Sequence, residues 1–179
     1  MTMFSFGQPD GGIVQTAYVV PNLSAAIETW IASLGVGPWF IAEHFKGTAM
    51  HYRGKPTTVD VSIGMAFAGH MCIELVTQHD DQPSVFQDVV SARGFGFHHW
   101  GIGTRHFDNL YAAQSAAGYE VLFTDRVPGG GRIAYFDSTS RLPGMTELIE
   151  VTEGVEALFQ RFYQSSIDWD GSDPVRPFF

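Results

Sequence analysis

Four polar side chains occupy matching places in the two halves of this 179-residue sequence. Gln15 and His99 lie in two predicted opening strands, and Glu74 and Glu147 lie in two predicted closing strands. Strand alternation sets each of them on one face between apolar or small neighbours. A carboxylate in such surroundings needs a partner or a metal ion. One imidazole with oxygen donors suits a divalent ion such as Zn, Ni, Co, Mn, Fe or Mg.

The adjacent histidines His98 and His99 present only one ring to that face. Aligning the two opening strands sets His99 on Gln15, so alternation places Phe97, His99 and Gly101 together. His98 is then expected on the opposite face, in a packing or interface role. A Glu or Gln taken alone on a strand more often faces solvent, so the hypothesis depends on the coincidence of all four positions.

The elements that position these residues form a β-α-β-β-β order that occurs twice. We expect a first module over 11–79, a linker helix within 80–94, a second module over 95–152, and a C-terminal helix and tail over 153–179. Ser24 is the expected cap of the first helix. The first module carries about eleven extra residues by comparison of the two halves, and we expect 47–56 to be a loop.

Composition excludes several classes of protein. Hydrophobic residues make up 45% of the chain and charged residues 16%, so a sizeable core is expected. The formal net charge of −9 disfavours a nucleic-acid binder. Cys72 is the only cysteine, so no internal disulfide is possible. The sequence has no apolar run long enough for a membrane span and no secretory signal at its start, so we expect a cytoplasmic protein.

Several segments together resemble the vicinal oxygen chelate superfamily, which includes glyoxalase I, methylmalonyl-CoA epimerase, bleomycin resistance proteins and extradiol dioxygenases. The segments are 14–20, 34–38, 73–75, 96–102 and 147–149. The resemblance implies an α+β fold in which two paired βαβββ modules form a cupped mixed sheet around a central site. It also implies one divalent metal ion, held by Gln15, Glu74, His99 and Glu147.

The expected activity is that of a metal-dependent isomerase, epimerase or lyase of the glyoxalase type. Such an enzyme moves a proton next to a carbonyl through a metal-stabilised enediolate. Glu147 is the favoured base, because a carboxylate that can leave the metal is free to accept a proton, and Glu43 is the second candidate. The substrate is expected to be a small to medium, partly apolar molecule. Aromatic and histidine residues expected in its pocket are Trp39, Phe40, Phe45, His51, Tyr52, Phe97 and Tyr135.

Two other functions stay open. The chain could be a non-catalytic protein that binds a drug or natural product, as bleomycin resistance proteins do. It could also be an Fe(II) ring-cleaving dioxygenase, although such sites use two histidines and one carboxylate, and Gln15 stands at one of those positions.

Assembly is the last expectation from the sequence. A cupped sheet leaves open strand edges and an apolar back surface, which family members cover by dimerising or by pairing modules. We therefore expect a homodimer. The apolar end, Pro177-Phe178-Phe179, is expected to pack on the body or on a neighbouring subunit.

Overall fold

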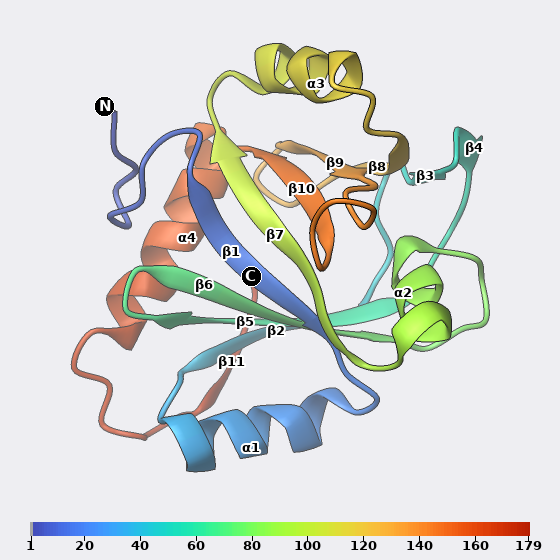
Figure 1. Ribbon diagram of the computed structural model, residues 1–179. Helices are drawn as coiled ribbons and strands as arrows, with labels where there is room; N and C mark the ends of the chain where they lie inside the picture. The colour runs from blue at the N-terminus through green and yellow to red at the C-terminus, as the bar shows by residue number, and fades with distance from the viewer. Residues whose placement is uncertain (1) are drawn as a thin grey trace.

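The protein has an α+β fold built on one large mixed sheet. The computed structural model describes residues 2–179, and over these residues four helices surround an 11-stranded sheet (Figure 1). The strand order is β11-β2-β5-β6-β1-β7-β10-β9-β8-β3-β4. None of the helices in this range is both long and apolar enough to cross a membrane.

Two similar groups of four strands meet at the centre of the sheet. The first group consists of β1 (Ile13–Val19), β2 (Trp39–Phe45), β5 (Val61–Ala68) and β6 (Met71–Gln78). The second consists of β7 (Gly96–Thr104), β8 (Val121–Arg126), β9 (Arg132–Phe136) and β10 (Met145–Glu150). In each group the opening strand pairs in parallel with the closing strand, and β1 pairs antiparallel with β7. The two opening strands therefore lie side by side at the seam between the groups.

Helices α1 (Leu23–Leu34) and α3 (Phe107–Ala116) cover the convex face of the sheet at opposite ends of the molecule (Figure 1). α1 packs on β5 and β6, and α3 packs on β9 and β10. The side chain of Asn22, not that of Ser24, caps α1, because its oxygen accepts a hydrogen bond from the Ala25 amide at 2.9 Å. Gly35 ends α1 in the left-handed conformation, with a φ of 64°.

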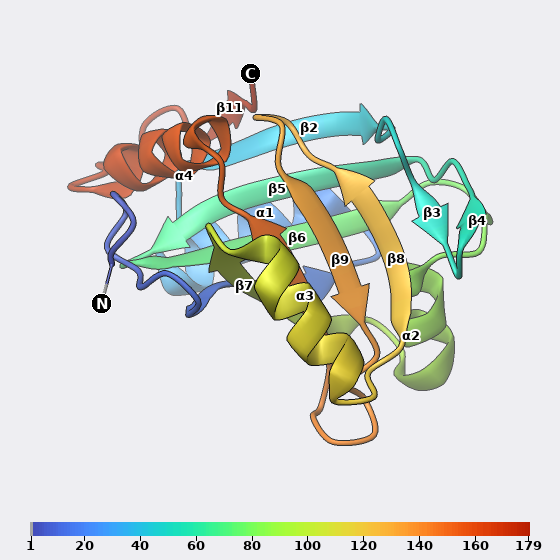
Figure 2. The same cartoon turned by 90° about the horizontal axis from the view of Figure 1, so that it is seen from above.

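Helix α4 (Glu153–Ser166) lies on the concave face of the sheet. Phe162 stacks on Phe40 of β2 with ring centres 4.2 Å apart, and Phe159 packs against Phe67 of β5. The chain then returns as β11 (Val175–Pro177), which pairs with the outer edge of β2 (Figure 2). Phe178 is buried against Phe162. The tail thus docks on its own chain and covers one edge of the sheet.

The extra segment of the first half forms a hairpin where we expected a loop. β3 (His51–Tyr52) and β4 (Lys55–Pro56) pair with each other, and β3 also pairs with β8 of the second half. This hairpin lies beyond β8 (Figure 2). The pairing partner is distant in sequence, so local composition alone could not indicate a strand here.

Two bulges interrupt the pairing of β1 with β7. Ile13 and Gln15 face Ile102 and Gly101, so Val14 is an extra residue in β1. Likewise Tyr18 and Ala17 face Phe97 and His99, so His98 is an extra residue in β7. Val14 and His98 come directly before Gln15 and His99, so the same irregularity occurs at equivalent places in both halves. A bulge changes which residues share a strand face, and it redirects the side chains beside it.

Candidate active site on the concave face

The structure brings Gln15, Glu74, His99 and Glu147 into one buried cluster. The side-chain nitrogen of Gln15 lies 3.0 Å from Glu74 Oε2 and 3.3 Å from both His99 Nε2 and Glu147 Oε2. His99 Nε2 is 3.1 Å from Glu147 Oε2 and 3.5 Å from Glu74 Oε2. The four residues are at most 5% exposed, so these groups meet almost without solvent.

Sheet register explains why these four residues meet. On the parallel pair β1 and β6, Ala17 is the partner of Glu74, and on the pair β7 and β10, Gly101 is the partner of Glu147. Ala17 and Gly101 also face His99 and Gln15 across the seam. Small residues at these two positions leave room for the four longer side chains. At Gly101 an added Cβ would lie 2.9 Å from the Cβ of Gln15, so no larger residue fits there without movement.

A hydrogen-bond relay sets the tautomer of His99. His98 Nε2 lies 3.0 Å from the carbonyl oxygen of Val85, which can only accept, so the proton of a neutral His98 is on Nε2. His98 Nδ1 therefore accepts, and it lies 2.8 Å from His99 Nδ1. His99 then carries its proton on Nδ1 and points the lone pair of Nε2 at the cluster. This is the arrangement of a metal-binding imidazole whose orientation a second group holds.

Burial keeps both histidines neutral. Burial, together with the repulsion that a protonated His99 would exert, lowers the pKa of His98 to about 3, and burial lowers the pKa of His99 to about 3. The carboxyl groups respond in the opposite sense. Burial raises the pKa of Glu147 to about 8, and burial together with the charge of Glu147 raises the pKa of Glu74 well above its usual range.

The donor set fits a divalent cation. Two buried carboxyl groups and a neutral imidazole face one another, and no Lys or Arg occurs among the described residues that line the adjoining cavity. Without a cation, the carboxyl groups must retain protons to avoid repulsion. The Gln15 side-chain oxygen is buried without a hydrogen-bond partner. Rotating this amide by 180° would direct its oxygen into the cluster as a fourth ligand. The oxygen and nitrogen of a side-chain amide are distinguished only by their hydrogen-bond partners, and a bound ion would favour the rotated orientation.

An apolar cavity opens above the cluster. Gln15, Glu74, Glu147 and Tyr135 form its polar floor, and Tyr135 lies opposite Glu147 on the neighbouring strand. Its walls and cover are mostly apolar, with contributions from the sheet, from α2 (Val85–Arg93) and from the C-terminal segment, including Phe45, Met65, Phe86, Phe123, Leu158, Phe159 and Phe178. The cavity therefore suits an apolar ligand whose polar end reaches the floor.

Several residues expected in the pocket lie elsewhere. Trp39 is buried on the convex face, where its ring lies 6.0 Å from that of Trp30, and Phe40 is covered by Phe162. The bulge at His98 turns Phe97 to the convex face, 5.8 Å from the ring of Tyr18. Only Phe45 and Tyr135 of the expected aromatic set line the cavity.

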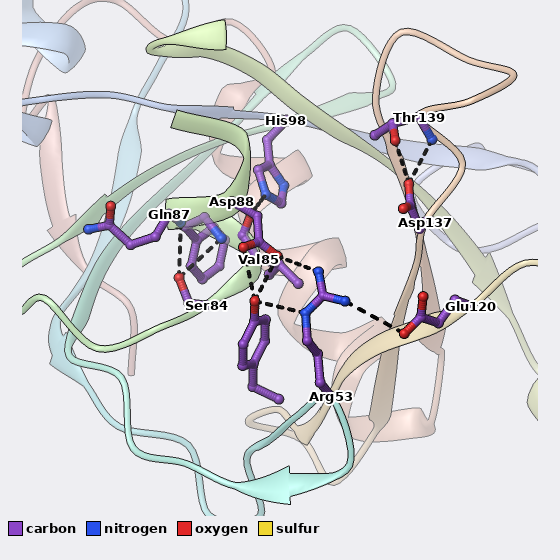
Figure 3. A network of polar contacts seen from close by, with 11 residues as sticks. Arg53, Ser84, Val85, Gln87, Asp88, His98, Glu120, Asp137 and Thr139 are labelled. Carbon is purple, nitrogen blue, oxygen red and sulfur yellow. Dashed lines mark hydrogen bonds and ion pairs between the residues drawn. The ribbon is translucent and has the colours of Figure 1, made fainter. Parts of the chain in front are cut away.

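The other expected polar residues are also outside the cavity. Glu43 is exposed on β2, and His51 is exposed on β3 with its Nδ1 2.9 Å from the Ala49 carbonyl oxygen. Tyr52 instead connects the β3–β4 hairpin to α2, because its hydroxyl donates a hydrogen bond to the Asp88 carboxylate at 2.9 Å. Figure 3 shows Arg53 between Asp88 and Glu120, its ion pairs lying at 3.2 and 3.6 Å.

Sequence reasoning missed three contributions to the site. His98 was expected on the opposite face, yet the bulge holds it on the concave side next to Val85 (Figure 3). Asp125 lines the cavity and accepts a hydrogen bond from the Ala49 amide at 3.0 Å. The C-terminal helix covers the cavity with Leu158 and Phe159. The aromatic content of residues 159–179 was the one available signal for that cover.

The fold and the site match a known family. The model of the glyoxalase/bleomycin resistance protein/dioxygenase superfamily matches residues 14–136, which is more than half of the chain. The chain therefore belongs to this superfamily, to which the vicinal oxygen chelate fold is common. No curated protein sequence matches the chain.

Solved structures show the same fold. A hypothetical protein from Bacillus halodurans is similar with a TM-score of 0.56 and 20% identity, over 79% of this chain and 94% of that one. Methylmalonyl-CoA epimerase from Mycobacterium tuberculosis has a TM-score of 0.55 and 17% identity, over 79% of this chain and 88% of that one. A Streptomyces coelicolor methylmalonyl-CoA epimerase variant in complex with 2-nitronate-propionyl-CoA has a TM-score of 0.52 and 19% identity, over 79% of this chain and 97% of that one. At these identities the likeness is one of fold.

Proposed function

We propose that this protein is a divalent-metal-dependent enzyme of the glyoxalase type, which transfers a proton next to a carbonyl group. The observation that carries the proposal is the buried meeting of Gln15, Glu74, His99 and Glu147 at the floor of an apolar cavity. Family membership supports it, because the superfamily includes enzymes of this kind.

The proposed ligands of the ion are the oxygen of the Gln15 amide, one carboxylate oxygen each of Glu74 and Glu147, and Nε2 of His99. When bound, the ion would supply Lewis-acid polarisation of a substrate carbonyl. The chain's own contribution is to hold the ligands in place before the ion arrives. His98 fixes the ring of His99, and strand pairing fixes the backbone of all four ligands.

Glu147 is the proposed base. Its carboxyl group lies in the floor of the cavity, where an apolar substrate would place its reacting carbon. Without an ion, burial raises the pKa of Glu147 to about 8, so a Glu147 carboxylate that has left the ion is a stronger base than an ordinary glutamate. The Tyr135 hydroxyl, on the neighbouring strand, opposes this increase in the pKa. Phe159 and Phe178 line the cavity with apolar surface and would shield the reacting carbon from water.

The lining of the cavity indicates what kind of substrate it takes. Among its described residues the only charged side chains are Glu74, Asp125 and Glu147, all acidic. Phosphate or other polyanionic groups would meet repulsion there, whereas aliphatic or aromatic groups would contact Met65, Phe86 and Phe123. The proposed substrate is a small to medium carbonyl compound with an apolar substituent.

Two measurements test the proposal together. After dialysis to remove weakly held ions, elemental analysis of wild type, His99→Ala and Glu147→Gln should show one tightly bound divalent ion per chain in wild type and much less in His99→Ala. NMR in D₂O should show deuterium entering the carbon next to the carbonyl in a panel of 2-oxo acids, 2-hydroxy ketones and thioesters, and Glu147→Gln should abolish that exchange.

Glu43→Gln is the matched control, because it makes the same change at an exposed carboxylate. It should keep both the ion and the exchange. Loss of exchange in Glu43→Gln, with exchange retained in Glu147→Gln, would assign the base to Glu43. Full metal occupancy in His99→Ala would reject the proposed ligand set.

The apolar lining of the cavity favours a second candidate function, the binding of an apolar small molecule without chemistry. The four residues of the central cluster, Gln15, Glu74, His99 and Glu147, already lie within hydrogen-bonding distance of one another, and only the oxygen of Gln15 lacks a partner among them. Metal-free protein that binds such a ligand tightly and exchanges no carbon-bound proton would establish this function.

A further inference from the structure

We propose that His44, Asp60 and His79 form a second metal site, for Zn²⁺, on the convex face of the sheet. One ligand atom from each residue lies within 4.8 Å of the other two. His44 Nδ1 is 3.0 Å from Asp60 Oδ1, and the rings of His44 and His79 lie with their centres 4.5 Å apart. Two imidazoles and one carboxylate form a donor set typical of zinc.

An irregularity in β2 directs His44 to this place. Alternation from Phe40 and Ala42 would direct residue 44 to the concave face, but the pairing of β2 with β5 shifts between Ala42 and Phe45. His44 has a φ of 49°, which is uncommon for a residue with a side chain. As a result Phe45 lines the cavity and His44 turns to Asp60. Unusual backbone conformations of this kind are concentrated at functional sites.

The sheet also holds the other two ligands. β5 and β6 are paired antiparallel, and beyond Val61 and Gln78 the amide of His79 donates to the carbonyl oxygen of Asp60 at 2.8 Å. The backbone amide of Asp60 donates to the Asp80 carboxylate at 3.0 Å. Ser62 links the two histidines, because its hydroxyl accepts from the His44 amide at 3.1 Å and lies 2.7 Å from His79 Nε2. The ligands are thus positioned before any ion binds.

This site is separate from the central cluster. Val61 and Ile63 of β5 line the concave cavity, so Asp60 and Ser62 belong to the other face by alternation. Gly64 lies on that other face too, since a Cβ added there would contact Ile27 and Leu23 of α1. An ion at His44, Asp60 and His79 would join the ends of β2, β5 and β6 and would not touch the reacting carbon.

The surroundings affect how strongly zinc binds. His44 and His79 are exposed, so water can complete the coordination of the ion. Lys46 places its ammonium nitrogen 3.9 Å from Asp60 Oδ2 and competes with an ion for that carboxylate. Asp80 adds negative charge next to Asp60. We therefore expect binding in the micromolar range, weaker than that of a buried zinc site.

Zinc titration against a chromogenic zinc indicator tests the inference, with tag-free protein first treated with a chelator. The double variant His44→Ala/His79→Ala should bind one ion fewer per chain than wild type. Asp60→Asn, which keeps the shape of the side chain, should weaken zinc binding at this site at least tenfold. His51→Ala is the matched control, because His51 is exposed and belongs to no metal-ligating group among residues 2–179, and it should bind as many ions as wild type.

The comparison is a difference in the number of ions, so it does not depend on whether the central cluster holds one. NMR signals of the His44 and His79 rings should shift when zinc is added beyond the amount that the central cluster binds. Equal numbers of bound ions in wild type and in the double variant, both folded by circular dichroism, would overturn the proposal. So would zinc binding in Asp60→Asn as tight as in wild type.

Discussion

The buried carboxyl group of Glu147 should make the metal-free protein less stable as the pH rises. In the folded protein its pKa is about 8, against an ordinary value of 4.5, because burial disfavours the charged form. The folded state therefore binds a proton that the unfolded state releases. The stability contributed by the neutral group is fully present below pH 4.5 and is lost as the pH rises to about 8.

The magnitude follows from that difference in pKa. Each tenfold change in a protonation equilibrium is worth about 1.4 kcal/mol, so a shift of this size corresponds to about 5 kcal/mol of the free energy of unfolding between the two limits. At 4% exposure, solvent hardly screens it. Glu147→Gln keeps the shape and removes the charge. Without metal, this variant should be about as stable as wild type at pH 4.5 and several kcal/mol more stable at pH 8.

Urea denaturation in the presence of a chelator, at pH 5, 6, 7 and 8, measures this directly. Glu43→Gln serves as the control, and its free energy of unfolding should fall with pH as that of wild type does. Added divalent ion should reduce the fall in wild type, because the ion replaces the protons that the carboxyl groups would otherwise retain. An equally steep fall in Glu147→Gln and in wild type would refute the reasoning.

Three further predictions concern the relay, the tail and the assembly. His98→Phe removes the partner of His99 Nδ1 and should weaken metal binding at the central site by about 10- to 100-fold in chelator competition; unchanged affinity would mean that packing alone orients His99. Phe178→Ala should lower the free energy of unfolding by about 3 kcal/mol in urea denaturation, whereas Phe179→Ala, at a side chain that is 69% exposed, should change it little. Light scattering should give twice the chain mass of 19.7 kDa for the predicted homodimer, and a 19.7 kDa particle would contradict it.

Regular local patterns predicted the repeated elements and the four residues of the central cluster. The apolar spacing in α1 and the apolar run of β6 are properties of short segments, so they predicted these elements without any contact between distant residues. The match between the two halves then aligned Gln15 with His99. That alignment held because both opening strands carry a bulge at the same place.

What sequence reasoning could not predict depends on contacts between distant segments. The rule that strand residues alternate between two faces does not reveal that His98 is an extra residue in β7. Applying it therefore placed Phe97 on the concave face, although the structure has it on the convex face. Trp39 begins β2 on the convex side because α1 covers it there. The strand β3 forms only because β8, some 70 residues later, offers an open edge.

The seam between β1 and β7 makes the central cluster a joint property of the two halves. Gln15 and Glu74 come from one half, and His99 and Glu147 from the other, so neither fragment of a chain cut within residues 80–83 would contain more than two of the four groups. Affinity for the ion would then report the reassociation of the fragments. The same dependence restricts how the two halves can diverge in evolution, because a slip of one residue at the seam would turn either Gln15 or His99 out of the cluster.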